Sequence, residues 1–512
     1  MAMLLLFSNW VSRQLEMRRS GLGFKPVAAP ENHDATRWGR LWLALPLAVY
    51  LLLPTRNYYW DGVAFAINVE KQLPLRDTLH PNHLLYTAAH VWLYHAALAI
   101  GIETRALFLM QFVNSLLAGT SVALVYRALR RRAIRTEAAI AGALAFAFAA
   151  TWWKFATDAD AYIPAIFLLL CANDLLETRR NVVLAGLTHA AAMLFHELAI
   201  LFLPIALWRL KEPKKAASYA VCSLGPTGIA YVLAYRVVCG QFRAAGLAGW
   251  VMARSPDASF SWRPVRDLGL TLEGTLRLFF GGRLDQATAE PFTIIGALAV
   301  AACIAGLAVG WKRGGPLRFR VPPKDLLLWV GVYLAFLLVW MPQNTFYRLF
   351  YLAPLVLAAC CAVGRTTVER VRADRLLPWT VCGVLFLWNL TFAIYPQSRV
   401  ENNAALRFAL AQHDHWPPGT PIAFHTFHPD LWTISYFNQQ ASWIGFDKMD
   451  LGRLEQSLAS ARQRGQPLWL EATAYDFLSA DAAGWRWLES HPAPRLLRFR
   501  DAKHEFRFYR VQ

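Results

Sequence analysis

Long apolar blocks separated by short basic clusters make up most of the first 394 residues of this 512-residue chain. The blocks are about 15–20 residues long, a length typical of helices that cross a bilayer. Several are shorter than the roughly 17–25 residues of a free-standing span, which is tolerated where helices border a water-filled cavity. The pattern predicts a polytopic α-helical membrane protein of about eleven transmembrane helices. The predicted spans are 41–53, 105–126, 137–153, 161–176, 181–196, 197–209, 216–238, 291–311, 325–341, 349–364 and 377–394.

The basic clusters predict the orientation, because Lys and Arg gather in cytoplasmic loops. With these clusters inside, the N-terminal segment 1–40 is cytoplasmic and the region 395–512 lies outside the membrane. The transmembrane domain is then 41–394, with long outer loops at 54–104 and 239–290. The clusters in question are 127–135, 179–180, 209–215, 312–324 and 365–375.

Two apolar stretches in the outer loops are predicted to lie along the membrane rather than cross it. If 83–100 crossed, Arg130–Arg132 would move outside, so we interpret it as an interfacial or re-entrant helix. Trp262–Phe280 has the aromatic and arginine content of another interfacial helix, although a plain loop is an alternative. One such helix is therefore predicted in the first outer loop and the other in the loop 239–290.

The C-terminal region has the pattern of a small α/β domain. Short apolar runs at Thr420–Phe424 and Pro467–Leu470 are each followed by a helical pattern. Trp443–Phe446 is a third candidate strand, and Leu496–Tyr509 contains the last one or two. A breaker, Pro417-Pro418-Gly419, precedes the first strand.

Composition and charge exclude several classes of protein. Apolar residues make up 56% of the chain and charged residues 17%, and the mean hydropathy is +0.29. The net charge is +18, but the region from 395 has 13 Lys+Arg and 12 Asp+Glu, so the excess belongs to the membrane part. A nucleic-acid partner is therefore not expected. The seven cysteines show neither a disulfide framework nor zinc spacing.

The first outer loop contains the first candidate for chemistry, Asp61, which follows Tyr58, Tyr59 and Trp60. A carboxylate just beyond a span and flanked by aromatic rings is well placed as a general base. The rings would stack on a sugar or a lipid headgroup. The alternative is that Asp61 caps a helix starting at Gly62 while the aromatic residues form an interfacial belt.

Two further carboxylates, Asp158 and Asp160, lie in a short turn predicted at the same membrane face. Either they cap helices in a solvated turn, or one of them contacts an acceptor, a metal or the first-loop carboxylate. The adjacent pair His196-Glu197 interrupts a continuous apolar stretch. Ionisable residues there are costly unless they face a polar cavity or pair with each other. In the functional interpretation, either His196 would hydrogen-bond a phosphate or Glu197 would help to hold a ligand.

The best cationic candidate is Arg348, at the predicted outer edge of a span beside Tyr347. A guanidinium there can hold a lipid phosphate through two hydrogen bonds, or it can extend to lipid headgroups instead. His80 and Arg56 are further cations of the same compartment. The sequence has no P-loop, GxGxxG, HExxH or GxSxG motif, so an activated donor has to come from the membrane or the outer side.

In their order, these residues resemble the class C (GT-C) glycosyltransferases that use polyprenyl-phosphate sugars, such as protein O-mannosyltransferases and the aminoarabinose transferases of lipid A. The resemblance covers about residues 40–394 and is one of pattern rather than of identical strings. The chain departs from the family at Gly62, where a second acidic residue is frequent, and at Asn82, where a second proline often follows the His-Pro pair.

The resemblance implies a membrane glycosyltransferase of the bacterial inner membrane, with two juxtamembrane helices in its long first outer loop. It also implies Asp61 as catalytic base, Arg348 binding the donor phosphate and His80 lining the same cavity. The donor would be a polyprenyl-phosphate sugar, and the acceptor a hydroxyl of a glycan, lipid or protein. The reaction would invert the anomeric carbon. No cofactor is certain, and a divalent metal stays open. The alternative functions are a transporter or flippase of lipid-linked sugars and a non-catalytic scaffold protein. A carrier should place ionisable groups at the midplane of repeated halves, and no repeat is visible.

Overall fold

The structure is a computed structural model that describes residues 33–71, 73–178, 181–252, 260, 262–282, 291–314, 321–363, 373–412, 415–425, 428–446, 449–492, 495–500 and 505–511. Most of the predicted cytoplasmic segment, the basic pair 179–180 and most of the basic cluster 365–375 lie outside these residues. All candidate site residues lie within them.

Helices account for nearly all of the described chain up to residue 412. Each of the eleven predicted apolar segments is helical over most of its length. The helices are α2 (His33–Leu52), α3 (Trp60–Glu70), α4 (Leu75–Thr78), η2 (Pro81–His83), α5 (Tyr86–Ala99), α6 (Ala106–Arg131), α7 (Thr136–Ala147), α8 (Ala150–Ala156), α9 (Tyr162–Glu177), α10 (Val182–Phe195), η3 (Glu197–Phe202), α11 (Leu203–Arg209), α12 (Pro213–Cys239), α13 (Ala244–Val251), α14 (Pro264–Phe279), α15 (Pro291–Gly314), α16 (Lys324–Val339), η5 (Phe346–Arg348), α17 (Leu349–Val363), α18 (Ala373–Asn389), η6 (Leu390–Ile394), α19 (Tyr395–Gln397), η7 (Val400–Asn402) and α20 (Ala404–Ala411).

The number of membrane-crossing helices is smaller by length than the eleven predicted. Among the described residues, four helical segments are long and apolar enough to cross a bilayer: α6, α12, Phe346–Val363 and Pro378–Gln397. The pair α7 and α8 is bent by 66° and adds a fifth if it is one broken span. Others are short: α10 has 14 residues and rises about 21 Å, less than the roughly 30 Å of a hydrocarbon core. The prediction of a polytopic helical membrane protein holds, but the count of eleven spans is not confirmed.

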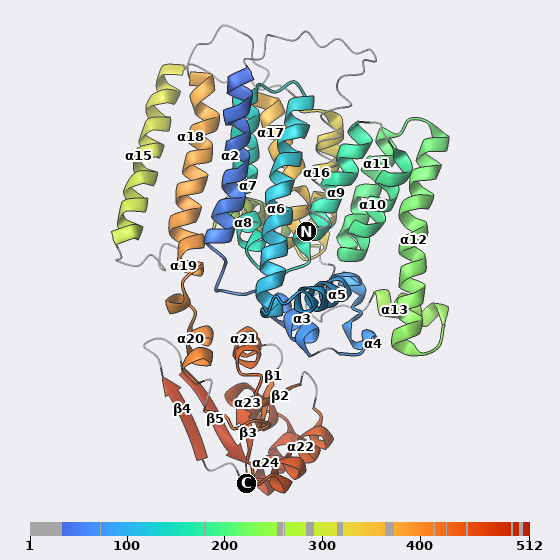
Figure 1. Ribbon diagram of the computed structural model, residues 1–512, viewed down its shortest axis with the longest axis vertical. Helices are drawn as coiled ribbons and strands as arrows, with labels where there is room; N and C mark the ends of the chain where they lie inside the picture. Colours follow the sequence, from blue (N-terminus) through green and yellow to red (C-terminus); the bar gives the residue numbers. More distant parts are fainter. Residues whose placement is uncertain are drawn as a thin grey trace. The chain divides into compact units, whose positions relative to one another are not determined.

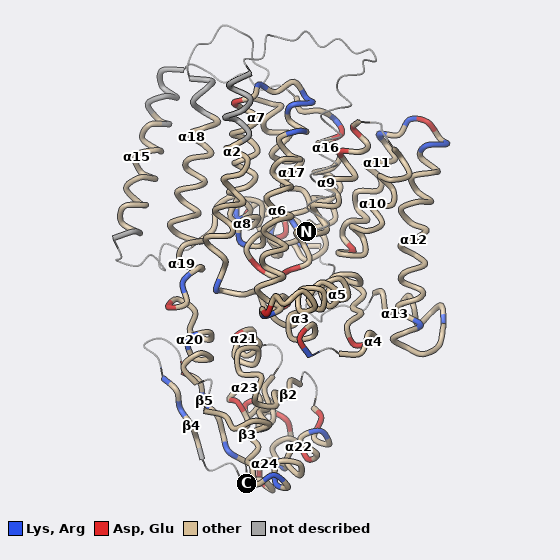
Figure 2. The backbone as a smooth tube through the Cα atoms, viewed as in Figure 1, with Lys and Arg blue, Asp and Glu red and all other residues tan. Residues whose placement is uncertain are grey.

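The helices pack side by side around α6, which contacts α7, α9 and α17. Figure 1 shows α10 between α9 and α12, and α15 beside α18. Large aromatic side chains fill the interior, among them the fully buried Trp152, Trp153 and Trp329. Lys and Arg gather near helix ends, and the middle of α18 carries almost no charge (Figure 2). These are the features of helices whose apolar faces meet lipid or one another.

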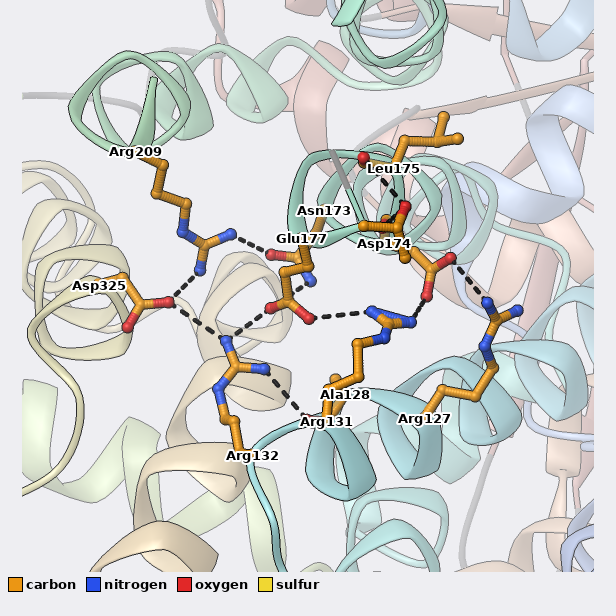
Figure 3. A network of polar contacts seen from close by, with 11 residues as sticks. Arg127, Ala128, Arg131, Arg132, Asn173, Asp174, Leu175, Glu177, Arg209 and Asp325 are labelled. Atoms are coloured by element: carbon orange, nitrogen blue, oxygen red, sulfur yellow. Dashed lines mark hydrogen bonds and ion pairs between the residues drawn. The ribbon is translucent and has the colours of Figure 1, made fainter. Parts of the chain in front are cut away.

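A network of ion pairs joins the basic ends of α6 and α11 to acidic residues on α9 and α16 (Figure 3). Asp325, at the start of α16, accepts hydrogen bonds from Arg132 (3.2 Å) and Arg209 (2.5 Å). The predicted basic clusters around Arg132 and Arg209 therefore lie on one side of the bundle, as their assignment to a single membrane face requires. The network comprises Arg127, Arg131, Arg132, Asn173, Asp174, Glu177, Arg209 and Asp325.

The C-terminal region contains one five-stranded sheet in the order β2-β1-β3-β5-β4. The first three of these strands are parallel and the last two antiparallel, and the register sets Ile422 of β1 opposite Trp443 and Trp469. Ile422 and Phe424 belong to one apolar cluster and Ala423 to another, so both faces of β1 are buried. The predicted strands coincide with β1 (Pro421–His425), β2 (Ser442–Phe446) and β3 (Leu468–Glu471), and the last segment divides into β4 (Arg495–Arg500) and β5 (Glu505–Val511). The helices between them are α21 (Pro429–Phe437), α22 (Leu451–Gln463), α23 (Ala472–Ser479) and α24 (Ala482–Ser490).

The two predicted interfacial stretches are helices α5 and α14. In α14 most of the apolar side chains point outward: Val265 is 89% exposed, and Leu272 and Leu276 are also exposed, whereas Leu278 is buried in the core. Its opposite face is small and polar, with buried Thr271 and Gly274 turned toward the protein. A soluble helix has the reverse arrangement, so this face fits the prediction that α14 lies in the membrane interface.

Candidate functional site

The start of α3 is fixed against the turn that follows α8, and this contact positions Asp61. The backbone N–H of Tyr59 donates to Oδ2 of Asp158 (2.9 Å), about a hundred residues away in sequence. A side chain at Gly62 would collide with the backbone carbonyl of Ala159. The glycine therefore permits a contact between the two loops, and it places Asp61 in the first turn of α3, beside the acidic turn.

The structure distinguishes the two aspartates of that turn, which the sequence left undecided. Asp158 is fully buried, and both of its oxygens accept backbone hydrogen bonds, from Tyr59 (2.9 Å) and from Ala159 (2.8 Å). Oδ1 of Asp160 accepts from the backbone of Ala161 (2.6 Å), whereas its buried Oδ2 has no hydrogen-bond partner among the described residues. Asp158 thus joins the loops, and Asp160 keeps an oxygen for other chemistry.

Asp61 and Asp160 form an interacting pair of carboxyl groups. Asp61 is half-buried, and burial raises its pKa from 3.8 to about 7. Burial and then the neighbouring charge of Asp61 raise the pKa of Asp160 well above its ordinary value. Two carboxylates that share a poorly hydrated site do not both ionise readily, so one stays protonated near neutral pH. The carboxyl group that interacts with Asp61 thus comes from a different loop.

Lys154, at the end of α8, is a site residue that the sequence reasoning missed. Its ammonium lies 5.4 Å from the ring centres of Tyr59 and Phe155 and 5.9 Å from that of Phe346. Its charge also lowers the pKa of Asp158, opposing the effect of burial. A lysine four residues before an aspartate at the end of a short apolar helix is the signal that would have identified it.

The short helix η5 connects this region to the paired ionisable residues after α10. The ring centre of Phe346 lies 4.9 Å from that of Tyr59, and the ring centre of Tyr347 lies 5.7 Å from that of His196. Tyr162, which follows the acidic turn, lies 5.0 Å from His196 and 6.0 Å from Tyr347. Segments near residues 60, 160, 196 and 347 are therefore neighbours, which confirms none of their roles but brings the predicted groups together.

His196 is buried within this aromatic cluster and presents one nitrogen to it. Nδ1 accepts a hydrogen bond from the backbone of Leu198 (3.2 Å), so the proton of the neutral ring lies on Nε2. Nε2 is buried and has no hydrogen-bond partner among the described residues. The neighbouring ring is His83, 4.8 Å away, whose pKa is lowered to about 3 by burial and by His80. His196 therefore offers an N–H donor next to a neutral imidazole.

Arg348 is more deeply placed than its predicted position at an outer edge. It is 0% exposed, and its guanidinium donates to the carbonyl of Pro342 (2.6 Å) and to the hydroxyls of Tyr351 (3.1 Å) and Thr271 (3.4 Å). Gly274 of α14 lies against its Nε, where a side chain would collide. The interpretation as a lipid-facing arginine does not fit this burial.

Some predicted residues lie at the margin of this cluster or point elsewhere. Tyr58 is buried against Phe437 of the C-terminal region, with 6.0 Å between the ring centres. Trp60 is 40% exposed. His80 is exposed and stacks on His83 at 6.0 Å. Glu197 opens η3 and is half-buried.

The described part of the chain contains no group of three or more His, Cys, Asp or Glu side chains placed to hold a metal ion. All seven cysteines are free thiols, in line with the absence of a disulfide framework in the sequence.

No family model matches the chain, and no curated protein matches its sequence. Among solved structures, it is similar to ArnT from Cupriavidus metallidurans bound to undecaprenyl phosphate, with a TM-score of 0.56 and 12% identity over 93% of this chain and 98% of that chain. ArnT is a class C aminoarabinose transferase. The fold is that of ArnT. The apo state of the same protein matches with a TM-score of 0.44 and 14% identity over the same shares. The resemblance to the class C family is thus confirmed at the level of the fold.

Proposed function

We propose that this protein is a membrane glycosyltransferase that moves a sugar from a polyprenyl-phosphate donor to an acceptor hydroxyl at the outer face of the membrane. The observation that carries the proposal is the Asp61–Asp160 pair, next to Lys154 and an aromatic cluster. The ArnT-like fold supports it, because the similar ArnT structure has undecaprenyl phosphate bound.

Asp61 acts as the general base. Its carboxylate removes the proton of the acceptor hydroxyl while the hydroxyl oxygen forms a bond to the anomeric carbon. The bond from that carbon to the phosphate oxygen breaks, its electron pair leaves with the lipid phosphate, and the anomeric configuration inverts. A pKa near 7 suits this task, because a base works best when its pKa is close to the working pH. Asp160, protonated, holds the acceptor by donating a hydrogen bond from its unpartnered side.

The leaving phosphate needs positive charge and hydrogen-bond donors. Lys154 supplies the charge nearest to Asp158, and Nε2 of His196 supplies a buried N–H. Arg348 adds positive charge for the phosphate; its guanidinium makes three hydrogen bonds within the protein, and its Nε has no partner among the described residues. His80, which is exposed and stacks on His83, lies at the outer side of the proposed donor site. Tyr59, whose ring faces Lys154, provides a surface for the sugar.

The test is sugar transfer by the purified full-length protein in proteoliposomes, with lipid-linked sugars extracted from bacterial membranes as donor. Asp61→Asn should lower the rate about 100-fold or more, because removing a general base costs roughly that factor. Asp77→Asn, which changes an exposed carboxylate of the same outer loop, is the matched control and should leave the rate unchanged.

Full activity of Asp61→Asn would remove Asp61 as the base. Movement of lipid-linked sugar across the bilayer without any transfer product would favour the transporter alternative. Adding a chelator to the same assay tests whether transfer depends on a metal ion.

A further inference from the structure

The carboxylate of Glu70, at the end of α3, is the centre of a hydrogen-bond cluster that lies apart from the proposed catalytic groups. Its Oε1 accepts from the hydroxyl of Tyr436 (2.5 Å), the backbone of Ala106 (2.8 Å) and Nε of Arg105 (3.0 Å). Its Oε2 accepts from the side-chain amide of Gln439 (3.0 Å) and again from Arg105 (3.1 Å). One carboxylate therefore connects three segments: the end of α3, the start of α6, and the C-terminal helix α21 with the residues after it.

Tyr436 of the C-terminal region makes several direct contacts in this cluster. Tyr436 is fully buried, and its hydroxyl also accepts from the backbone N–H of Leu107 (3.1 Å). Arg105 donates to the backbone carbonyl of Tyr436 (2.8 Å), and its guanidinium lies 4.1 Å from the centre of that ring. Buried hydrogen bonds to a charged group are costly to break.

A second set of contacts ties the segment before α3 to the same region. The backbone N–H of Arg56 donates to the carbonyl of Gln397 (2.7 Å), and the amide of Asn403 donates to the carbonyl of Arg56 (2.6 Å). The ring of Tyr58 stacks on that of Phe437. The C-terminal region thus holds the chain on both sides of α3.

We infer that the C-terminal region sets the position of the base, with Glu70 and Tyr436 as positioning residues that act through α3. Asp61 and Glu70 are nine residues apart on one helix, about 14 Å along its axis. The start of that helix is fixed by Asp158, and its end is fixed by Tyr436 and Gln439. A short helix held at both ends cannot shift without moving Asp61 relative to Asp160. The catalytic part of this inference rests on the function proposed above.

The experiment compares Tyr436→Phe, which removes one hydroxyl, with Tyr475→Phe as a matched control, since Tyr475 stacks on Tyr509 inside the C-terminal region. In Tyr436→Phe we expect kcat to fall about 10-fold with KM for the donor changed less than about twofold. Looser packing hydrates Asp61, so the midpoint of the acidic limb of the pH–rate profile should shift to lower pH. Glu70→Gln, which keeps the shape and removes the charge, should act in the same direction.

A second readout, hydrogen exchange of the α3 backbone amides in the same full-length variants, does not depend on activity. Faster exchange of α3 in Tyr436→Phe but not in Tyr475→Phe supports the coupling, even if the wild-type protein transfers no sugar. The absence of sugar transfer by the wild-type protein would refute the proposed function but not the coupling between Tyr436 and α3. Unchanged kcat, pH midpoint and exchange in an active protein would overturn the inference. A fall in folded protein that leaves the kcat of the folded fraction and the pH midpoint unchanged would also overturn it, because the contact would then be structural only.

Discussion

The pH dependence of transfer follows from the surroundings of Asp61. With a pKa of about 7, Asp61 is about one-tenth ionised at pH 6 and about nine-tenths ionised at pH 8. A reaction that needs the ionised base should therefore accelerate about tenfold between these two values. With the ordinary pKa of 3.8, ionisation would be nearly complete at both, and the rate would be flat. The position of the acidic limb thus reports the burial of this single carboxyl group.

The assay is the initial rate of transfer from saturating lipid-linked donor in proteoliposomes between pH 5 and 9, with donor KM measured at each pH. Burial alone raises the pKa of Asp61, so Asp160→Asn should lower kcat but keep the limb near neutral pH. The residual rate of Asp61→Asn should lack the limb altogether. A wild-type rate that is constant from pH 5 to 8, or a limb that persists without Asp61, would refute the assignment of Asp61 as the buried base.

Three other substitutions test the geometry. Gly62→Ala places a methyl group against the carbonyl of Ala159, so it should lower kcat about 10- to 100-fold with little change in donor KM; wild-type kinetics would contradict the close packing of the two loops. Lys154→Met keeps the length of the side chain and removes its charge, so it should raise the KM for the donor about tenfold, whereas Lys154→Arg should retain part of the affinity. A donor KM of Lys154→Met equal to that of the wild type would exclude Lys154 as a phosphate ligand. Arg348→Lys removes the guanidinium that donates hydrogen bonds to three oxygens, so it should destabilise the protein by about 2–4 kcal/mol and lower the midpoint of thermal unfolding. An unchanged midpoint would show that these hydrogen bonds do not contribute to stability.

Elements with a strong local pattern could be predicted from the sequence. The three parallel strands were placed to within a residue or two because each is a short apolar run that follows a breaker or a turn. The helix at Trp262–Phe280 was predicted from its aromatic and arginine content, and it is α14. The span count could not be fixed, because short apolar helices such as α10 and α11 have the composition of spans without the length.

The pairing of Asp61 with Asp160 could not be predicted, because it depends on the contact of Gly62 with a turn about a hundred residues away. The sequence indicated that both carboxylates belonged to one membrane face, but not which aspartate of the turn was engaged. The predicted role of Arg348 as a donor-phosphate ligand stays a prediction, and its burial was not foreseen. Its depth depends on Gly274, which lets α14 approach the guanidinium. Lys154 was missed because the acidic residues after it dominated the interpretation of that turn.

The exposed apolar face of α14 is in contact with the surrounding lipid or detergent, and the same helix contacts Arg348. Val265, Leu268 and Leu272 are exposed, whereas the opposite face of the helix packs on Arg348. A detergent micelle and a bilayer surround such a face differently, so the helix and the guanidinium beneath it respond to the choice of solubilising agent. For the proposed transferase we therefore expect kinetic constants that depend on the surrounding lipid and differ between nanodiscs and detergent.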